Sequence, residues 1–128
     1  MKIYGIGVDL LKIKKIKKLL KSKKNSTKRI FTIHENKISR RIRNKEMYFA
    51  KRFAAKEAFS KALGTGISDG LNFNEIETFS NNKGKPSLRI LGKSRIIVKK
   101  ILKNKRFTIY LSLSDEKTYA IAFVVIAL

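Results

Sequence analysis

The strongest constraint on the fold is a long run of good helix formers at about residues 45–63 that contains neither Gly nor Pro. Asn44 can cap the start of this helix through its side-chain oxygen, and Gly64 can end it in a left-handed conformation. A chain of 128 residues suits one compact domain with one core and leaves little room for two. We therefore expect residues 1–128 to form a single domain that includes this helix.

The N-terminal segment predicts a strand followed by a basic amphipathic helix. Residues 2–8 are β-branched and Gly-containing, which is typical of a buried strand. From Leu10 the apolar residues recur at helical spacing with lysines between them, and Asp9 is well placed to cap that helix. The apolar positions are Leu10, Ile13, Ile16, Leu19 and Leu20, and the lysines are Lys12, Lys14, Lys15, Lys17, Lys18 and Lys21.

Polar residues 22–28 indicate a loop, and a short helix is expected to follow it. Thr32 and Glu35 have the spacing of a capping box, in which each side chain accepts a hydrogen bond from the other's backbone N–H. His34 is the only histidine and lies inside this box. A surface position at a helix start is therefore expected for His34 rather than a catalytic role.

The second half of the chain predicts four strands and one helix. A hairpin-type turn is expected at 81–84, and Pro86 lies at the start of the next strand, where a missing N–H is tolerated. The order of elements favours an α+β fold, in which a mainly antiparallel sheet has helices on one side. The expected strands are 72–80, 85–91, 106–114 and 118–127, with 115–117 as the last turn and a helix at 93–104.

Charge and composition limit the classes of function. The net charge is +22, from 31 Lys and Arg against 9 Asp and Glu, and such a field attracts nucleic acid, anionic membranes, acidic proteins or phosphorylated small molecules. The plain alternative is that abundant Lys, Ile and Asn reflect genome composition and that many lysines only solvate the surface. The absence of Cys excludes disulfides, thiolate metal sites and a Cys nucleophile. With no secretory signal and no apolar run long enough to cross a bilayer, we expect a cytoplasmic protein without membrane insertion.

Two carboxylates on regular structure are the candidates for chemistry, Asp9 at the end of the first strand and Glu57 in the middle of the long helix. Mg²⁺ prefers oxygen ligands and is usually held by one or two carboxylates together with substrate phosphates. Lys61 follows Glu57 by one helical turn, on the same face, where it could neutralise phosphate oxygens. The alternative, favoured without further context, is a Glu57–Lys61 surface pair contributing on the order of a few tenths of a kcal/mol.

These residues belong to a series of motifs by which the chain resembles the holo-acyl-carrier-protein synthases. The most specific motif is the central segment 49–67, Phe-Ala-Lys-Arg-Phe-Ala-Ala-Lys-Glu-Ala-Phe-Ser-Lys-Ala-Leu-Gly-Thr-Gly-Ile. The motifs follow the family's order and run nearly from end to end. The others are Gly5-Ile6-Gly7-Val8-Asp9, Phe31-Thr32 with Glu35, Gly84-Lys85-Pro86, and Leu111-Ser112-Leu113-Ser114-Asp115-Glu116 with Tyr119-Ala120.

The resemblance implies the phosphopantetheinyl transferase fold and a homotrimer with each active site between neighbouring protomers. It implies that Asp9 and Glu57 are catalytic carboxylates that hold Mg²⁺, and that Lys61 is a catalytic residue that meets the phosphates of coenzyme A. The coenzyme A pocket would consist of Lys61, Gly64, Thr65, Lys85 and Pro86.

The resemblance also implies the reaction. A serine of an acidic apo-acyl carrier protein attacks the phosphorus next to the pantetheine arm of coenzyme A, adenosine 3′,5′-bisphosphate leaves, and the carrier is activated for fatty acid biosynthesis. The carrier would dock on the basic first helix near Lys12, Lys14, Lys15 and Lys18. Residues 118–127 are apolar on both faces, more than an edge strand should leave in water, which together with the resemblance favours a trimer.

One motif departs from the family. Relatives typically have Ser-His-Glu where this chain has Ser114-Asp115-Glu116, so no role of that histidine carries over. A carboxylate with an ordinary pKa near ~3.9 is a weak base at neutral pH. We therefore expect Asp115 to hold the last turn or to orient substrate rather than to accept the serine proton.

The rival prediction from another class is a small basic nucleic-acid-binding module. The charge, the lysine-rich helix and the eight Phe and four Tyr support it. Against it, most aromatic residues fall at apolar, core-like positions, and Asp9 and Glu57 would repel phosphate unless a cation lay between them. We expect no nucleic-acid partner.

Overall fold

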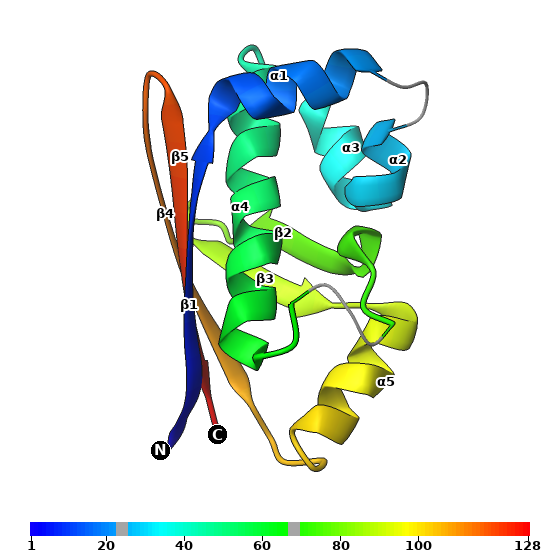
Figure 1. Ribbon diagram of the computed structural model, residues 1–128, viewed down its shortest axis with the longest axis vertical. Coiled ribbons are helices and arrows are strands. Elements are labelled where there is room, and N and C mark those ends of the chain that lie inside the picture. The colour runs from blue at the N-terminus through cyan, green and yellow to red at the C-terminus, as the bar shows by residue number, and fades with distance from the viewer. Residues whose placement is uncertain (23–25, 67–69) are drawn as a thin grey trace.

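A three-stranded antiparallel sheet with the long helix across one face forms the frame of the molecule (Figure 1). The structure is a computed structural model that describes residues 1–22, 26–66 and 70–128. In the sheet, β5 (Tyr119–Ala127) lies between β1 (Ile3–Lys12) and β4 (Thr108–Glu116), and α4 (Lys45–Leu63) packs mainly on β1 and β5. A second antiparallel sheet pairs β2 with β3. The remaining elements are α1 (Ile13–Ser22), α2 (Ser26–Ile30), α3 (Ile33–Ser39), the 3₁₀ turn η1 (Phe73–Glu75), β2 (Ile76–Ser80), β3 (Pro86–Ile90) and α5 (Gly92–Ile101).

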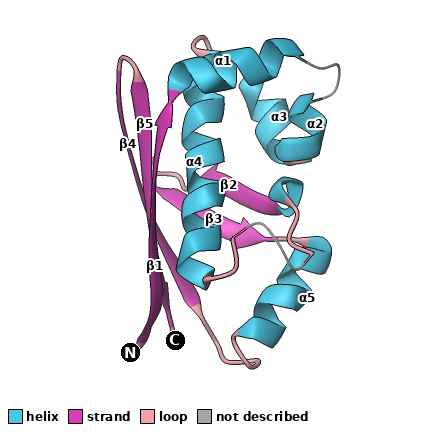
Figure 2. Ribbon diagram, in the orientation of Figure 1, coloured by secondary structure: helices cyan, strands magenta, loops and turns pink. Residues whose placement is uncertain are grey.

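The α+β class expected from the sequence is confirmed, with the strands divided between two antiparallel sheets instead of one. Figure 2 shows the helices on the same side of the three-stranded sheet. Among the described residues, no helix combines the length and apolar character needed to cross a bilayer.

Both predicted ends of α4 are confirmed. The Asn44 side chain accepts a hydrogen bond from the backbone N–H of Met47 at 3.1 Å. At the other end Gly64 has φ +91°, a left-handed conformation that costs a glycine little, and its N–H donates to the carbonyls of Ser60 and Lys61. The helix is buried along most of its length, and its alanines allow neighbouring backbone to approach it closely.

The predicted helix start, with Asp9 as the cap and Leu10 as the first apolar position, is wrong. β1 continues to Lys12, and α1 begins only at Ile13. Asp9 pairs with Ala122 in the middle of the strand and therefore does not cap a helix. Leu10 lies on the outer face of the sheet, where 61% of it is exposed, instead of on the buried face of the helix. The reason is tertiary: regular pairing with β5 from Gly5 to Lys12 outweighs a helical spacing that Leu10 also fits.

The capping box is confirmed. Thr32 Oγ1 accepts from the Glu35 N–H at 3.1 Å, Glu35 Oε1 accepts from the Thr32 N–H at 3.0 Å, and His34 is exposed beside them. The predicted loop 22–28 is partly wrong, because α2 already begins at Ser26, while residues 23–25 lie outside the described part of the chain.

In the second half of the chain the strand expected from residue 72 begins only at Ile76, after η1. Glu75 accounts for the difference, because its carboxylate turns toward α5 and accepts hydrogen bonds from the backbone N–H of Lys93 at 3.0 Å and the hydroxyl of Ser94 at 2.8 Å. The helix expected at 93–104 is α5, which ends earlier, at Ile101, and is followed by Lys103 and Asn104 in left-handed conformations with φ of 54° and 60°. Pro86 is the first residue of β3 as predicted. The strand expected at 106–114 is β4, which begins two residues later and continues to Glu116. The last turn therefore consists of residues 117–118 instead of 115–117, and β5 begins at Tyr119, one residue later than expected.

Candidate active site

Two glycines let α4 lie directly on β1. A Cβ on Gly7 would be 1.9 Å from the carbonyl oxygen of Ala58, and a Cβ on Gly5 would be 1.9 Å from that of Ala62. No side chain fits between such backbones, so this stretch of strand needs glycine at alternate positions. Asp9 is the next inward-facing residue of β1 after Gly7. The close packing therefore places its carboxylate against α4.

Asp9 meets Lys61 at this contact. The Lys61 Nζ lies 3.2 Å from Asp9 Oδ1 and also donates a hydrogen bond to the carbonyl of Val8 at 3.0 Å. The Lys61 side chain is 52% exposed and that of Asp9 16%, so the pair lies at the surface with the carboxylate on its inner side. The ion pair that the sequence left open, Glu57 with Lys61, is replaced by one between helix and strand.

Glu57 lies half-buried one turn before Lys61 on α4. Burial raises the pKa of the Glu57 carboxyl, the negative charge of Asp9 raises it further, and the positive charge of Lys61 opposes both. The two carboxylates are therefore near enough to repel each other, and a cation between them would relieve that repulsion. Two carboxylates are also the protein donor set with which Mg²⁺ is usually held alongside phosphates and water. Among the described residues, no group of three or more His, Cys, Asp or Glu side chains gathers to hold a metal.

The predicted coenzyme A residues fall in two places. Gly64 and Thr65 directly follow α4, near Lys61, and the Thr65 hydroxyl donates to the carbonyl of Gly66 at 2.8 Å. Ile67, the last residue of the central motif, lies outside the described residues. Lys85 and Pro86 instead line a hollow of about 350 Å³ together with residues of β4 and β5. Asp9 is on β1, which is one edge of the three-stranded sheet, and β4 is the opposite edge. Lys85 and Pro86 therefore lie toward the opposite edge of the sheet from Asp9.

A buried ion pair next to Glu57 was not predicted from the sequence. Lys56 is fully buried, with its Nζ 2.7 Å from Glu35 Oε1, and it also donates to the backbone carbonyls of Phe73 and Ile76. Burial lowers the pKa of Lys56, and the charge of Glu35 opposes that shift. The other oxygen of Glu35 accepts from the N–H of Thr78 at 2.8 Å. These bonds fix α4 to α3, η1 and β2, and with them the rotation of α4 about its own axis next to Glu57.

Asp115 and the basic helix complete the set of predicted residues. Asp115 Oδ2 lies 3.1 Å from the Nζ of Lys51, so it links the end of β4 to α4. Lys14, Lys15 and Lys18 are exposed on α1. Lys12 is exposed as well, but as the last residue of β1 and not on the helix.

Asp9, Glu57 and Lys61 thus lie in one region, where α4 packs on β1, and comparison with known proteins identifies the family to which such a chain belongs. The sequence profile of the 4′-phosphopantetheinyl transferase superfamily matches residues 5–124. The chain belongs to this superfamily. The resemblance inferred from the motifs is confirmed.

Individual relatives narrow the comparison. The chain is 47% identical over 126 residues to the holo-[acyl-carrier-protein] synthase of Pelagibacter ubique (strain HTCC1062), covering 98% of both chains. Among solved structures, the holo-[acyl-carrier-protein] synthase of Neisseria meningitidis superimposes with a TM-score of 0.87 at 36% identity, covering 98% of this chain and 99% of that one. The holo-(acyl-carrier-protein) synthase of Bacillus anthracis str. Ames in complex with CoA (3′,5′-ADP) superimposes with a TM-score of 0.80 at 33% identity. The match covers 98% of this chain and 97% of that one.

Proposed function

We propose that this protein transfers 4′-phosphopantetheine from coenzyme A to a serine of an apo-acyl carrier protein, releases adenosine 3′,5′-bisphosphate and so activates the carrier for fatty acid biosynthesis. The observation that carries the proposal is the ion pair of Asp9 with Lys61 where α4 crosses β1, with the Glu57 carboxyl near enough for both charges to shift its pKa. All three occupy the motif positions of a family whose members this chain matches over nearly its whole length. Transfer requires stabilisation of negative charge on a pyrophosphate, which suits a lysine and two carboxylates able to hold a cation.

Asp9 and Glu57 would hold Mg²⁺, and Lys61 would bind the phosphate oxygens of coenzyme A. When bound, Mg²⁺ neutralises phosphate oxygens and stabilises the charge that develops on the leaving group. Lys61 already lies at the surface with three donor protons, so it can exchange the carbonyl of Val8 for a phosphate oxygen while it keeps Asp9 as a neighbour. Glu57 stays ionised only above its raised pKa, so the site should weaken in acid.

Asp115 is not assigned the role of base. Its carboxylate is engaged by Lys51 at 3.1 Å, an ion pair that it would have to give up in order to approach the serine proton. The proposed role of Asp115 is to hold the end of β4 against α4, next to the last turn.

We also propose the homotrimer and the shared site implied by the family. The outer face of the three-stranded sheet leaves several large apolar side chains exposed together, which is typical of a surface that another protein chain covers. Since β5 is the middle strand, the surface to be covered is this face and not a strand edge. A neighbouring protomer would bring its Lys85 and Pro86 to the Asp9 edge of the first. The exposed apolar residues are Tyr4, Ile6, Val8, Leu10, Tyr110, Ile121 and Phe123.

The acidic carrier would dock on the exposed lysines near Lys12, Lys14, Lys15 and Lys18, where opposite charge speeds association. The cytoplasmic location, the single domain over residues 1–128 and the absence of a nucleic-acid partner remain predictions from the sequence. The nucleic-acid rival gains no support from the aromatic residues, because Phe31, Phe49 and Phe59 are buried in the core.

Mass spectrometry of the carrier tests the proposed function directly. The purified protein is mixed with coenzyme A, Mg²⁺ and an apo-acyl carrier protein, and the expected result is a carrier that gains one phosphopantetheine group while adenosine 3′,5′-bisphosphate accumulates. Omitting Mg²⁺ with a chelator present should stop the gain. No mass gain from a folded protein, with several carriers tried, would refute the assignment.

A further inference from the structure

A hollow of about 790 Å³ lies between β3, the C-terminal half of α5 and the start of β4. Figure 1 shows α5 at the opposite end of the molecule from α1, so this hollow is separate from the basic first helix. β3 and β4 contact each other here but belong to different sheets, and both contribute to the wall of the hollow. Ligand pockets typically have volumes of about 300–1,000 Å³, so the hollow is large enough for a small organic molecule.

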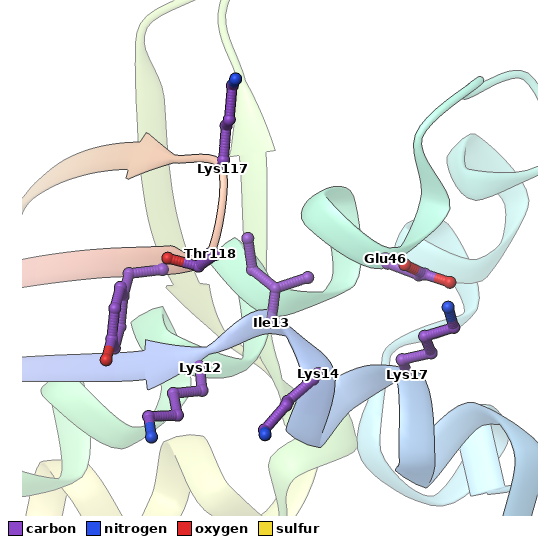
Figure 3. A pocket seen from close by; sticks show the side chains of 8 residues that line it. Lys12, Ile13, Lys14, Lys17, Glu46, Lys117 and Thr118 are labelled. Carbon is purple, nitrogen blue, oxygen red and sulfur yellow. The ribbon is translucent and has the colours of Figure 1, made fainter.

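The charged side chains that line the hollow are all positive. Five of the twelve lining residues are Lys or Arg and none is acidic, compared with 31 Lys and Arg in the 128 residues of the chain, so positive charge is concentrated here. The hollow at the start of α1 differs, because Glu46 lies among its lysines and Lys17 points toward it (Figure 3). The five cations are Arg89 of β3, Arg95 and Lys99 of α5, and Lys105 and Arg106 before β4.

Arg89 is held in place by its own neighbours. Its Nε donates to Glu77 Oε2 at 2.5 Å, and its guanidinium carbon lies 4.3 Å from the ring centre of Phe79. Thr32 Oγ1 donates to the other oxygen of the buried Glu77 carboxylate at 2.5 Å. The Arg89 side chain is nonetheless 48% exposed, and its two terminal nitrogens carry further N–H donors. A guanidinium fixed in this way loses little side-chain entropy when an anion binds to it.

The other four cations have no carboxylate within ion-pair distance in the described part of the chain. Arg95 and Lys99 are exposed one helical turn apart, a spacing at which like charges repel each other. Glu75, the carboxylate that contacts α5, is engaged at the other end of this helix, where it accepts from the hydroxyl of Ser94 at 2.8 Å. An anion from outside the chain would relieve the repulsion between the cations.

The backbone after α5 brings Lys105 and Arg106 back to the hollow. Lys103 and Asn104 both have left-handed conformations, which are uncommon for residues other than Gly. The N–H of Asn104 donates to the carbonyl of Lys99 at 2.7 Å, which fixes this bend against the last turn of α5. Backbone conformations of this kind are frequent at ligand-binding segments, because the surrounding structure must hold them in place.

Apolar side chains complete the lining. Leu88 and Ile90 are buried, and Phe107 and Ile109 are half-buried. Inorganic phosphate would use the charge of the hollow and leave these side chains uncovered, whereas a flat base could pack on them, and on Phe107 in particular. The combination therefore favours a ligand that has both a base and several phosphates.

We propose that this hollow binds a nucleoside polyphosphate, whose phosphates contact the five cations and whose base packs on Phe107. The hollow shares Ser87 and Ile109 with the hollow that Lys85 and Pro86 line, but it shares none of the five cations. The charge that attracts the phosphates is therefore separate from the proposed coenzyme A site, and the inference does not rest on the proposed transfer reaction.

Titration with ATP in the absence of metal, followed by isothermal calorimetry, tests the proposal. At about 0.1 M salt, where charges farther apart than about 10 Å are largely screened, we expect the parent to bind one ATP per chain. Lys99→Glu should weaken ATP binding about tenfold or more, from one attraction lost and one repulsion gained, and Arg95→Glu should do the same. Both side chains are exposed, so the thermal unfolding midpoints should stay near that of the parent. Tripolyphosphate should bind more weakly than ATP, because it cannot cover the apolar lining.

Two control variants separate the outcomes. Lys100→Glu makes the same change of net charge at the neighbouring exposed position of α5, which does not line the hollow, and it should keep the ATP affinity of the parent. Equal losses in Lys99→Glu and Lys100→Glu would mean that only the net charge attracts ATP and would overturn the proposal. A loss in Lys85→Glu without one in Lys99→Glu would overturn it too, by assigning ATP to the other hollow. A parent that binds no ATP, or that binds tripolyphosphate as tightly as ATP, would refute a nucleoside polyphosphate as the ligand.

Discussion

Adding a single methyl group to Gly7 should move α4 away from β1 and so separate Glu57 and Lys61 from Asp9. In Gly7→Ala the new Cβ would lie 1.9 Å from the Ala58 carbonyl oxygen and 2.7 Å from the backbone nitrogen of Ala62. Both obstacles are backbone atoms of α4, so no side-chain rotation removes them. Moving from 1.9 Å to an ordinary contact of 3.4 Å requires α4 to retreat from β1 by about 1.5 Å.

This retreat has two measurable costs. Overpacking of this kind typically destabilises by about 1–3 kcal/mol, and a clash with backbone belongs at the upper end of that range. Glu57 precedes Ala58 and moves with it, while Asp9 stays on β1, so the carboxylates separate and the 3.2 Å contact of Asp9 with Lys61 is lost. Because a misplacement of about 1 Å at a reacting centre can cost roughly 10²-fold, we expect transfer to fall by about that factor.

The assays are urea unfolding followed by circular dichroism and Mg²⁺ titration by calorimetry. Gly7→Ala should lower the free energy of unfolding by about 3 kcal/mol and weaken Mg²⁺ binding about tenfold or more. Gly84→Ala is the control: its φ of +78° makes alanine strained, but no atom lies within 4 Å of the added Cβ. The control should lose about 1–2 kcal/mol and keep its Mg²⁺ affinity. A Gly7→Ala protein that is as stable as the parent and binds Mg²⁺ equally well would refute the close packing as the basis of the site.

Four further predictions concern the carboxylates. Asp9→Ala and Glu57→Ala should each fold and lose at least roughly 10²-fold in turnover, measured by carrier mass gain, and normal turnover at low Mg²⁺ would remove the proposed site. Because burial and the charge of Asp9 raise the pKa of Glu57, protonation competes with the metal, so calorimetry should show Mg²⁺ affinity falling as the pH is lowered through that pKa. In metal-free protein the raised pKa means that ionised Glu57 destabilises the folded state. The free energy of unfolding of Glu57→Gln should therefore exceed that of the parent above that pKa and equal it in acid. Equal unfolding curves at every pH would contradict this. Asp115→Asn loses only a half-exposed pair with Lys51, so it should cost far less turnover than Asp9→Ala and leave the pH–rate profile unchanged, whereas an equal loss would make Asp115 the base.

The sequence was sufficient for features that depend on neighbours within about one helical turn. The ends of α4 follow from Asn44 and Gly64, and the start of α3 follows from Thr32 and Glu35, because each of these caps is completed by hydrogen bonds to residues three or four positions away. The family motifs were equally accessible, since they are strings of residues in order. They identified Asp9, Glu57 and Lys61 as a group before any geometry placed Asp9 beside Lys61.

Features that join distant parts of the chain were decided only by the tertiary structure. Leu10 fits both a helix and a strand locally, and it becomes strand because residues more than 100 positions later pair with it. The partner of Lys61 is on β1 and the partner of Lys56 is on α3, and neither follows from spacing along α4. Lys85 lies across the sheet from Asp9, although both belong to one set of motifs. Burial, backbone approach and charge pairing depend on positions in space, and these arise only when the strands find their register and α4 settles on the glycines of β1.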